Sequence, residues 1–148
     1  MPLSPSVLGI IIGGLIPAVF FGLASLFSKA SVQSGIGSGI YLMISGLAIV
    51  VVGIVVHFFV PDRTLSLRSG FHAIAVGVTY GIAAACIVIA MARFKTPLSQ
   101  LVPLFNMNTL VSVLLALWIF AEWQQVKVLQ LLFGAFLIVV GGILVSLA

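Results

Sequence analysis

A stripe of polar side chains on an otherwise apolar segment holds the chain's best candidates for binding chemistry. Asn108, Thr109 and Ser112 share an arc of about 100° if the segment is helical, and Asn106 lies about 60° outside it. Amide and hydroxyl groups suit a neutral or zwitterionic ligand better than a multivalent ion, because they offer hydrogen bonds without charge. Asparagines also bond neighbouring helices well, so lining a pathway and joining helices both remain open.

Tyr80 adds a phenol near the middle of another apolar segment. A hydroxyl in that position needs a partner, so Tyr80 either bonds another helix or faces a wet cavity. The predicted substrate contacts are therefore Tyr80, Asn106, Asn108, Thr109 and Ser112.

The acidic, basic and imidazole side chains lie near predicted helix ends. The only acids are Asp62 and Glu122. His57 and His72 could relay protons, but contact with headgroup water is the preferred interpretation. Lys29 is expected to mark the end of the first helix and to extend toward the interface, with attraction of an anionic substrate as the alternative.

Nothing in the sequence predicts an enzyme. It contains no nucleophile-base pair, no metal-ligand cluster and no phosphate-binding loop, so we expect no metal and no other cofactor. Cys86 is interpreted as a small packing residue. The six basic residues form no stripe that could neutralise phosphates, which argues against nucleic acid as a partner.

The composition of the chain indicates which kind of secondary structure carries these groups. With 63% hydrophobic and 5% charged residues and a mean hydropathy of +1.43, the chain belongs in a lipid bilayer. Continuous apolar runs favour helices over a barrel. We predict an all-α polytopic membrane protein, a single domain over residues 1–148, with five transmembrane helices at Val7–Ser28, Gly39–Val60, Phe71–Ala92, Leu98–Ala121 and Val128–Leu147.

Proline and glycine refine this outline. Pro17 and Pro103 each lack an N–H group and clash with a carbonyl four residues earlier, so both predict helix kinks. Gly134 and Gly141 lie two turns apart on one face of the last, almost entirely apolar helix. Such a strip suits helix association better than solute passage.

The basic residues do not select an orientation. Three would lie on the N-terminal side (Arg63, Arg68, Lys127) and three on the other (Lys29, Arg93, Lys95). A dual-topology antiparallel homodimer, an oppositely oriented partner and a fixed topology all remain open.

Several segments together resemble a known family. SLFSKA at the end of the first run, TPLSQLVPLF, AEW and the glycine-rich last run look like one repeat of the EamA family in the drug/metabolite transporter superfamily. The resemblance spans essentially the whole chain and is strongest over residues 96–148. Family members carry two oppositely oriented repeats, so the resemblance implies one inverted-repeat half of a ten-helix transporter, completed by a second copy.

The last helix also resembles the terminal helix of small multidrug resistance proteins, whose antiparallel dimers meet at a glycine pair seven residues apart. That resemblance implies a dimer contact at Gly134 and Gly141. Those proteins couple transport to protons through a glutamate in the first helix, where this chain has no carboxylate. Glu122 corresponds to the acid that often ends the fourth EamA helix, and a structural role at that turn is preferred over proton coupling.

Together these features predict a transporter, for example an efflux protein, in the plasma (inner) membrane. It would carry a small neutral or zwitterionic metabolite by alternating access, with the first, third and fourth helices lining the path. The expected partners are the bilayer, the small-molecule substrate, and a second copy or paired homologous subunit. The alternatives are a flippase subunit for a lipid-linked substrate and a non-transporting membrane assembly subunit.

Overall fold

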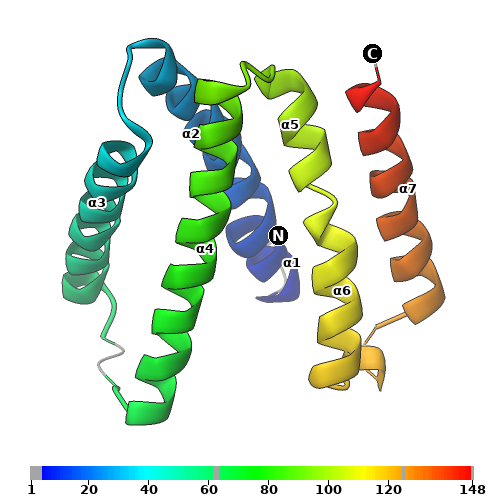
Figure 1. Ribbon diagram of the computed structural model, residues 1–148. Helices are drawn as coiled ribbons and strands as arrows, with labels where there is room; N and C mark the ends of the chain where they lie inside the picture. The colour runs from blue at the N-terminus through cyan, green and yellow to red at the C-terminus, as the bar shows by residue number, and fades with distance from the viewer. Residues whose placement is uncertain (1–4, 62–63, 125, 148) are drawn as a thin grey trace. The chain divides into compact units, whose positions relative to one another are not determined.

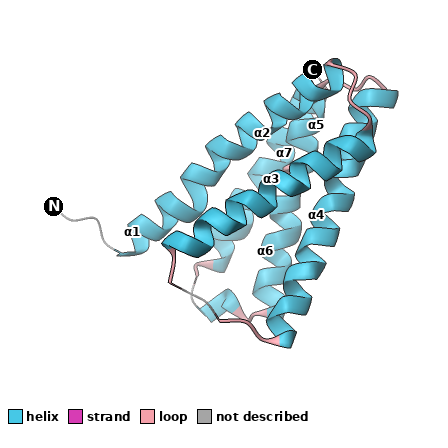
Figure 2. Cartoon of the chain, turned by 90° about the vertical axis from the view of Figure 1, so that its left-hand side faces the viewer, coloured by secondary structure: helices cyan, strands magenta, loops and turns pink. Residues whose placement is uncertain are grey.

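The computed structural model describes residues 5–61, 64–124 and 126–147, and these residues form helices joined by short loops (Figures 1 and 2). Five of the helical segments are long and apolar enough to cross a bilayer, namely Val7–Gln33, Ser38–Phe59, Leu67–Arg93, Leu98–Ile119 and Val128–Val145. No strand occurs among the described residues. The prediction of an all-helical chain with five helices able to span a membrane is confirmed for these residues, and this is consistent with a multi-pass membrane protein.

The helices belong to two compact units. The unit ending at residue 95 contains α1 (Pro5–Ile10), the π-helical turn η1 (Ile11–Leu15), α2 (Ile16–Gln33), α3 (Ser38–Phe59) and α4 (Leu67–Arg93). The unit beginning at residue 96 contains α5 (Leu98–Phe105), α6 (Asn108–Ile119), the short 3-10 helix η2 (Glu122–Gln124) and α7 (Val128–Ser146).

The first span contains a wide turn directly before its proline. The N–H group of Ile16 donates to the carbonyl of Ile11, five residues earlier, and Pro17 follows in the first turn of α2. A proline ring clashes with the carbonyl four residues before it, here that of Gly13. Gly13 lies in the π-helical turn, and such turns are a recognised cause of helix irregularity. The bend at Pro17 remains a prediction.

The first span is longer than predicted, so the assignment of its end to Lys29 is wrong. Helix α2 continues to Gln33, and both the N–H group and the hydroxyl of Ser34 donate to the carbonyl of Ala30. The chain turns only at Gly35, whose φ of 84° suits glycine. Lys29 therefore lies one turn inside the helix.

The sequence had suggested that His72 begins the third span, and this prediction is wrong. Helix α4 begins at Leu67, since Ser66 caps it by accepting the Ser69 N–H group at 3.1 Å while the Ser69 hydroxyl accepts the Ser66 N–H group at 3.0 Å. This serine capping box extends the helix upstream of the apolar run. His72 lies in the second turn, with Nδ1 2.7 Å from the carbonyl oxygen of Arg68.

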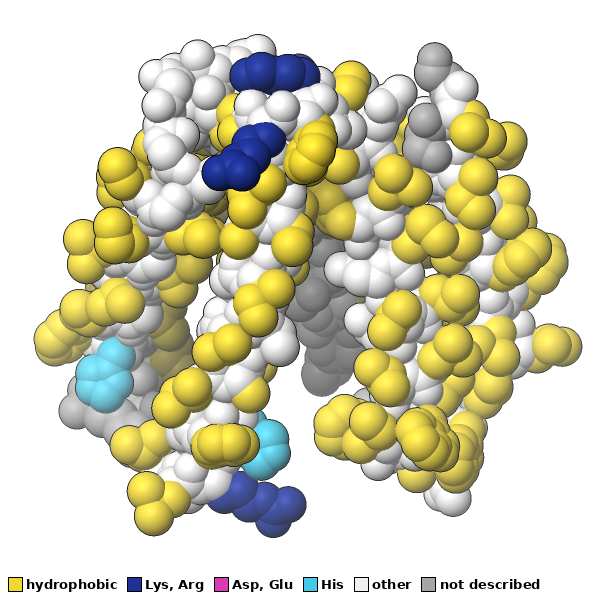
Figure 3. All heavy atoms as spheres, in the orientation of Figure 1, with side chains coloured by type: hydrophobic (Ala, Val, Ile, Leu, Met, Phe, Trp, Pro, Cys, Tyr) yellow, Lys and Arg dark blue, Asp and Glu magenta, His cyan; other side chains and the backbone are white. Residues whose placement is uncertain are grey.

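Packing inside the N-terminal unit is concentrated where α2 ends, α3 begins and α4 ends. Helix α4 contacts both α2 and α3. The buried residues are Ser28 on α2 and Val88 and Met91 near the end of α4. Hydrophobic side chains cover much of the visible helix surface (Figure 3). A bilayer can solvate such surfaces, whereas water cannot.

In the C-terminal unit, α7 packs against both α5 and α6. Leu117 on α6 and Ala135 and Gly142 on α7 are buried. A Cβ atom at Gly142 would lie 2.9 Å from the carbonyl oxygen of Pro103. Glycine therefore lets α7 and α5 approach backbone to backbone.

Candidate functional site

The fourth span, predicted as one helix kinked at Pro103, consists of two helical segments. It is broken at Asn106 and Met107, between α5 and α6, and α6 ends at Ile119. The N–H groups of Thr109 and Leu110 donate to the carbonyls of Asn106 and Met107, each at 3.1 Å and each three residues back. Bonds of this spacing make a tighter turn than the α-helix.

Local chemistry accounts for the break. Pro103 has no N–H group for the preceding turn, and asparagine is a poor residue for a helix interior. The Thr109 hydroxyl donates to the Asn106 carbonyl at 2.9 Å. This bond gives the Asn106 carbonyl a side-chain partner that it would not need in a continuous helix, and so it stabilises the turn. The break follows eight residues of α5, which corresponds to ~12 Å of helix. It therefore falls well inside a bilayer about 30 Å thick.

The stripe residues flank this break. Asn106, Asn108 and Ser112 are exposed in the chain, and their side chains form no hydrogen bond with the described residues. Thr109 is half-buried and forms the bond described above. Because α6 is regular from Asn108 onward, the shared arc of Asn108, Thr109 and Ser112 is retained, whereas Asn106 lies on the other side of a backbone turn.

Tyr80 belongs to the other unit. It lies on α4, is 52% exposed, and makes no hydrogen bond with the described part of the chain. Its inclusion with the stripe as a substrate contact therefore remains a prediction.

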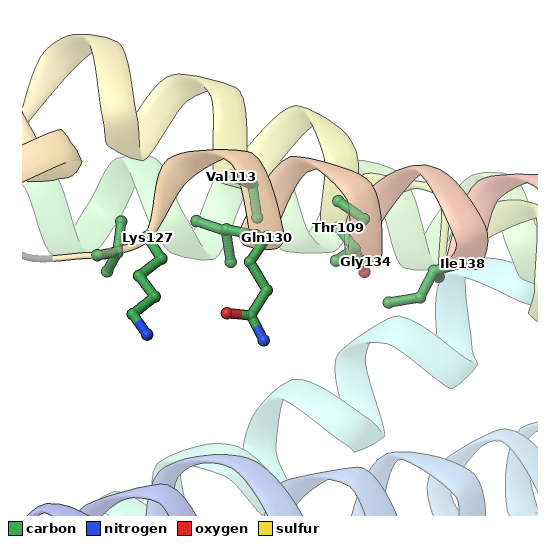
Figure 4. Close-up of a pocket in the computed structure, with 9 residues that line it drawn as sticks. Thr109, Val113, Lys127, Gln130, Gly134 and Ile138 are labelled. Atoms are coloured by element: carbon green, nitrogen blue, oxygen red, sulfur yellow. The ribbon is translucent and has the colours of Figure 1, made fainter.

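A groove of about 590 Å³ runs between α6 and α7 in the C-terminal unit. Six of its residues are labelled in Figure 4: Thr109, Val113, Lys127, Gln130, Gly134 and Ile138. The side chains of Lys127 and Gln130 extend to the same side of α7, while Thr109 lies farther along the groove. The groove thus joins a polar end at the start of α7 to a mainly apolar trough that reaches toward the helix break.

A second, smaller hollow of about 270 Å³ lies between α2 and α3. Four hydroxyl-bearing residues line it: Ser28, Ser31, Tyr41 and Ser45. Sequence reasoning missed Ser31 because it placed the end of the first helix at Ser28. The signal was present in the spacings of three residues between Ser28 and Ser31 and four between Tyr41 and Ser45, which put each pair on one helix face.

The glycines of α7 divide between two neighbouring faces. Cβ atoms built at Gly134 and Gly141 would have nothing within 4 Å beyond their own helix. Ala135, which is 4% exposed, and the buried Gly142 are also seven residues apart, and they form the face that packs inside the unit. Sequence reasoning missed this second pair, although the Gly141-Gly142 doublet pointed to it. The dimer contact at Gly134 and Gly141 remains a prediction.

Groups with catalytic or metal-binding chemistry are sparse. No group of three His, Cys, Asp or Glu residues among those described is placed to hold a metal ion. Cys86 is exposed on α4. Asp62 and Arg63, and the side chain of Glu122, lie outside the described part of the structure.

No protein-family model matches the chain, and no curated protein or solved structure matches it either. The resemblance to an EamA repeat and to the last helix of small multidrug resistance proteins therefore depends on the residues alone.

Proposed function

We propose that the chain is a membrane transporter for a small neutral or zwitterionic metabolite. The break in the fourth span is the observation that carries this proposal. Within a bilayer, backbone groups freed by a proline or by a tight turn must be satisfied by neighbouring helices, side chains or ordered water. Transporters commonly bind substrates at discontinuous helices near the midplane. Asn106, Asn108 and Thr109 would supply amide and hydroxyl groups at this break, with Ser112 and Tyr80 as further contacts.

The working unit in this proposal is an antiparallel homodimer, or the chain paired with an oppositely oriented partner. The chain buries only four hydrophobic side chains among its described residues, so most helix surface is free for lipid or a second copy. The open Cβ positions at Gly134 and Gly141 suit a close approach by another helix. Equal numbers of basic residues on the two predicted sides favour insertion in both orientations. Alternating access would involve rocking about Pro17 and Pro103.

Transport by purified protein in liposomes tests the proposal, using a panel of radiolabelled neutral and zwitterionic metabolites. Asn108→Leu should abolish uptake while leaving the oligomer intact, because it removes the amide from the proposed path. Val111→Leu, at an exposed apolar position on the same helix, is the matched control and should transport normally. Loss of the dimer in Asn108→Leu would identify a packing role instead, and normal uptake would contradict the proposed path.

Coupling and topology have their own tests. Both carboxylates are predicted to lie at membrane boundaries, so facilitated diffusion or exchange is proposed rather than proton antiport. Uptake should therefore change little when a pH gradient is imposed, and strong dependence would contradict this part of the proposal. A reporter fused to the C-terminus should give signal on both sides of the membrane. Signal on one side only would exclude dual insertion.

Flipping of a lipid-linked substrate is the second candidate. The groove between α6 and α7 favours it, because a polar end and an apolar trough suit an amphipathic molecule. Lipid-scrambling assays in the same liposomes would separate the two functions, since a metabolite transporter should leave labelled lipids in their original leaflet.

A further inference from the structure

The groove between α6 and α7 has chemistry that the proposed transport path does not use. Lys127 precedes the first residue of α7, and its ammonium group forms no ion pair or hydrogen bond with the described residues. Gln130 extends to the same side one turn later (Figure 4). Among the side chains that the structure describes, no acidic residue lies in the first turn of α7 or lines the groove. The described lining at this end of the groove therefore offers an anion one cation and one amide, and no carboxylate.

Beyond this polar end, the groove is apolar. Val113, Leu131 and Ile138 line it, and Gly134 leaves space in its wall. Its length is set by the stretch from Lys127 to Ile138, eleven positions later, which extends ~16 Å along a helix. One leaflet of the hydrocarbon core is about 15 Å thick, half of a 30 Å core. The trough therefore matches the depth of one acyl chain.

We propose that this groove binds an anionic phospholipid, with its phosphate at Lys127 and Gln130 and one acyl chain along Val113, Leu131 and Ile138. Lys127 begins a membrane-spanning helix, which places its charge at headgroup level, where basic residues attract anionic lipids. The ammonium group and the Gln130 amide donate to phosphate oxygens. A zwitterionic lipid offers the same phosphate but adds a cation that Lys127 repels. The site discriminates by net headgroup charge and does not depend on transport activity.

Native mass spectrometry on the delipidated full-length protein tests the proposal. The protein is titrated with phosphatidylglycerol or phosphatidylcholine of identical acyl chains, and occupancy by the first bound lipid is compared. Wild type should bind phosphatidylglycerol at least about threefold more tightly, and Lys127→Gln should bring the ratio close to one. Arg68→Gln is the matched control, because it removes an exposed cation from the first turn of α4, which is predicted to lie on the same side of the membrane as Lys127. It should keep the wild-type ratio.

A second pair of variants tests the acyl-chain trough. Gly134→Leu should lower first-site occupancy by both lipids severalfold, because its side chain would enter the groove. Gly141→Leu also adds bulk at an open position on α7, but Gly141 does not line the groove. Lipid occupancy of the first site in this variant should therefore equal that of wild type. Binding is compared within one oligomeric species, because both glycines are also predicted to contact a partner.

Three outcomes would overturn the proposal. They are equal binding of the two lipids by wild type, a preference retained by Lys127→Gln, or equal effects of Gly134→Leu and Gly141→Leu. Failure of the transport assay with normal lipid selectivity would refute the proposed function and leave this site standing.

Discussion

Gly142→Ala should destabilise the C-terminal unit, whereas Gly141→Ala should not. The new Cβ atom at position 142 would lie 2.9 Å from the Pro103 carbonyl oxygen and 3.5 Å from its carbonyl carbon. Both are backbone atoms, so no side chain can rotate away and the helices must separate. At position 141 the new Cβ atom meets nothing within 4 Å.

Comparison with Gly141→Ala makes the loss of stability in Gly142→Ala interpretable. Both variants gain the same helix propensity, about 1 kcal/mol for alanine over glycine, so this term cancels in the comparison. The difference between their free energies of unfolding then measures the cost of overpacking, typically about 1–3 kcal/mol. Gly141→Ala should be equal to or more stable than wild type, and Gly142→Ala should be less stable than Gly141→Ala by this amount.

Unfolding in mixed micelles by increasing fractions of dodecyl sulfate provides the assay. Trp118 and Trp123, the only tryptophans, both lie in the C-terminal unit, so their fluorescence follows this unit. An effect of Gly141→Ala that depends on protein concentration would reflect the predicted dimer contact, whereas the Gly142→Ala effect should not vary with concentration. Equal stabilities of the two variants at low concentration would refute the close approach of α7 to α5.

Three further predictions use the same assay. Val88→Ala should lower the free energy of unfolding by about 1–2 kcal/mol, because Val88 is 1% exposed and its packing contacts would be lost. The control Val78→Ala, at a 55% exposed site on the same helix, should have little effect. Ala121→Gly should raise it by up to about 1 kcal/mol, because Ala121 has a φ of 53° that glycine adopts without strain; destabilisation would contradict that backbone geometry. Thr109→Val should cost about 0.5–1.5 kcal/mol by removing the bond to the Asn106 carbonyl, and Thr109→Ser should keep most of that stability, so equal losses would argue against the bond.

The sequence was sufficient to predict the number and approximate limits of the spans. Hydrocarbon thickness fixes the length of an apolar helix, and the second and fifth spans, α3 and α7, end within one residue of their predicted limits. The larger errors occurred where hydrogen bonding, rather than hydropathy, decides the boundary. Ser66 and Ser69 extend α4 upstream, and Gly35 rather than Lys29 determines where the first span stops.

The candidate site was less predictable, because it depends on which helix faces meet. The sequence located the polar stripe and predicted a kink at Pro103, but Pro103 alone does not reveal a turn three residues later at Asn106. The Thr109 bond that stabilises this turn is a local contact and cannot be read from helical periodicity. Predicting the groove also required knowing that α6 packs against α7. This packing brings Thr109 beside Gly134, although the two are far apart in sequence.

Helix α7 shows how one helix can serve two kinds of packing. Residues seven apart recur on nearly the same helix face, so Gly134 with Gly141 and Ala135 with Gly142 form two strips separated by about 100°. The second strip is occupied inside the chain, because Ala135 is buried and Gly142 meets the Pro103 backbone. The first strip, Gly134 with Gly141, does not take part in this packing inside the chain, because its Cβ positions are open. A dimer formed at the first strip would therefore leave the packing of α7 against α5 and α6 intact. The two strips should therefore respond independently to substitution, with self-association changing at Gly141 and intrachain stability changing at Gly142.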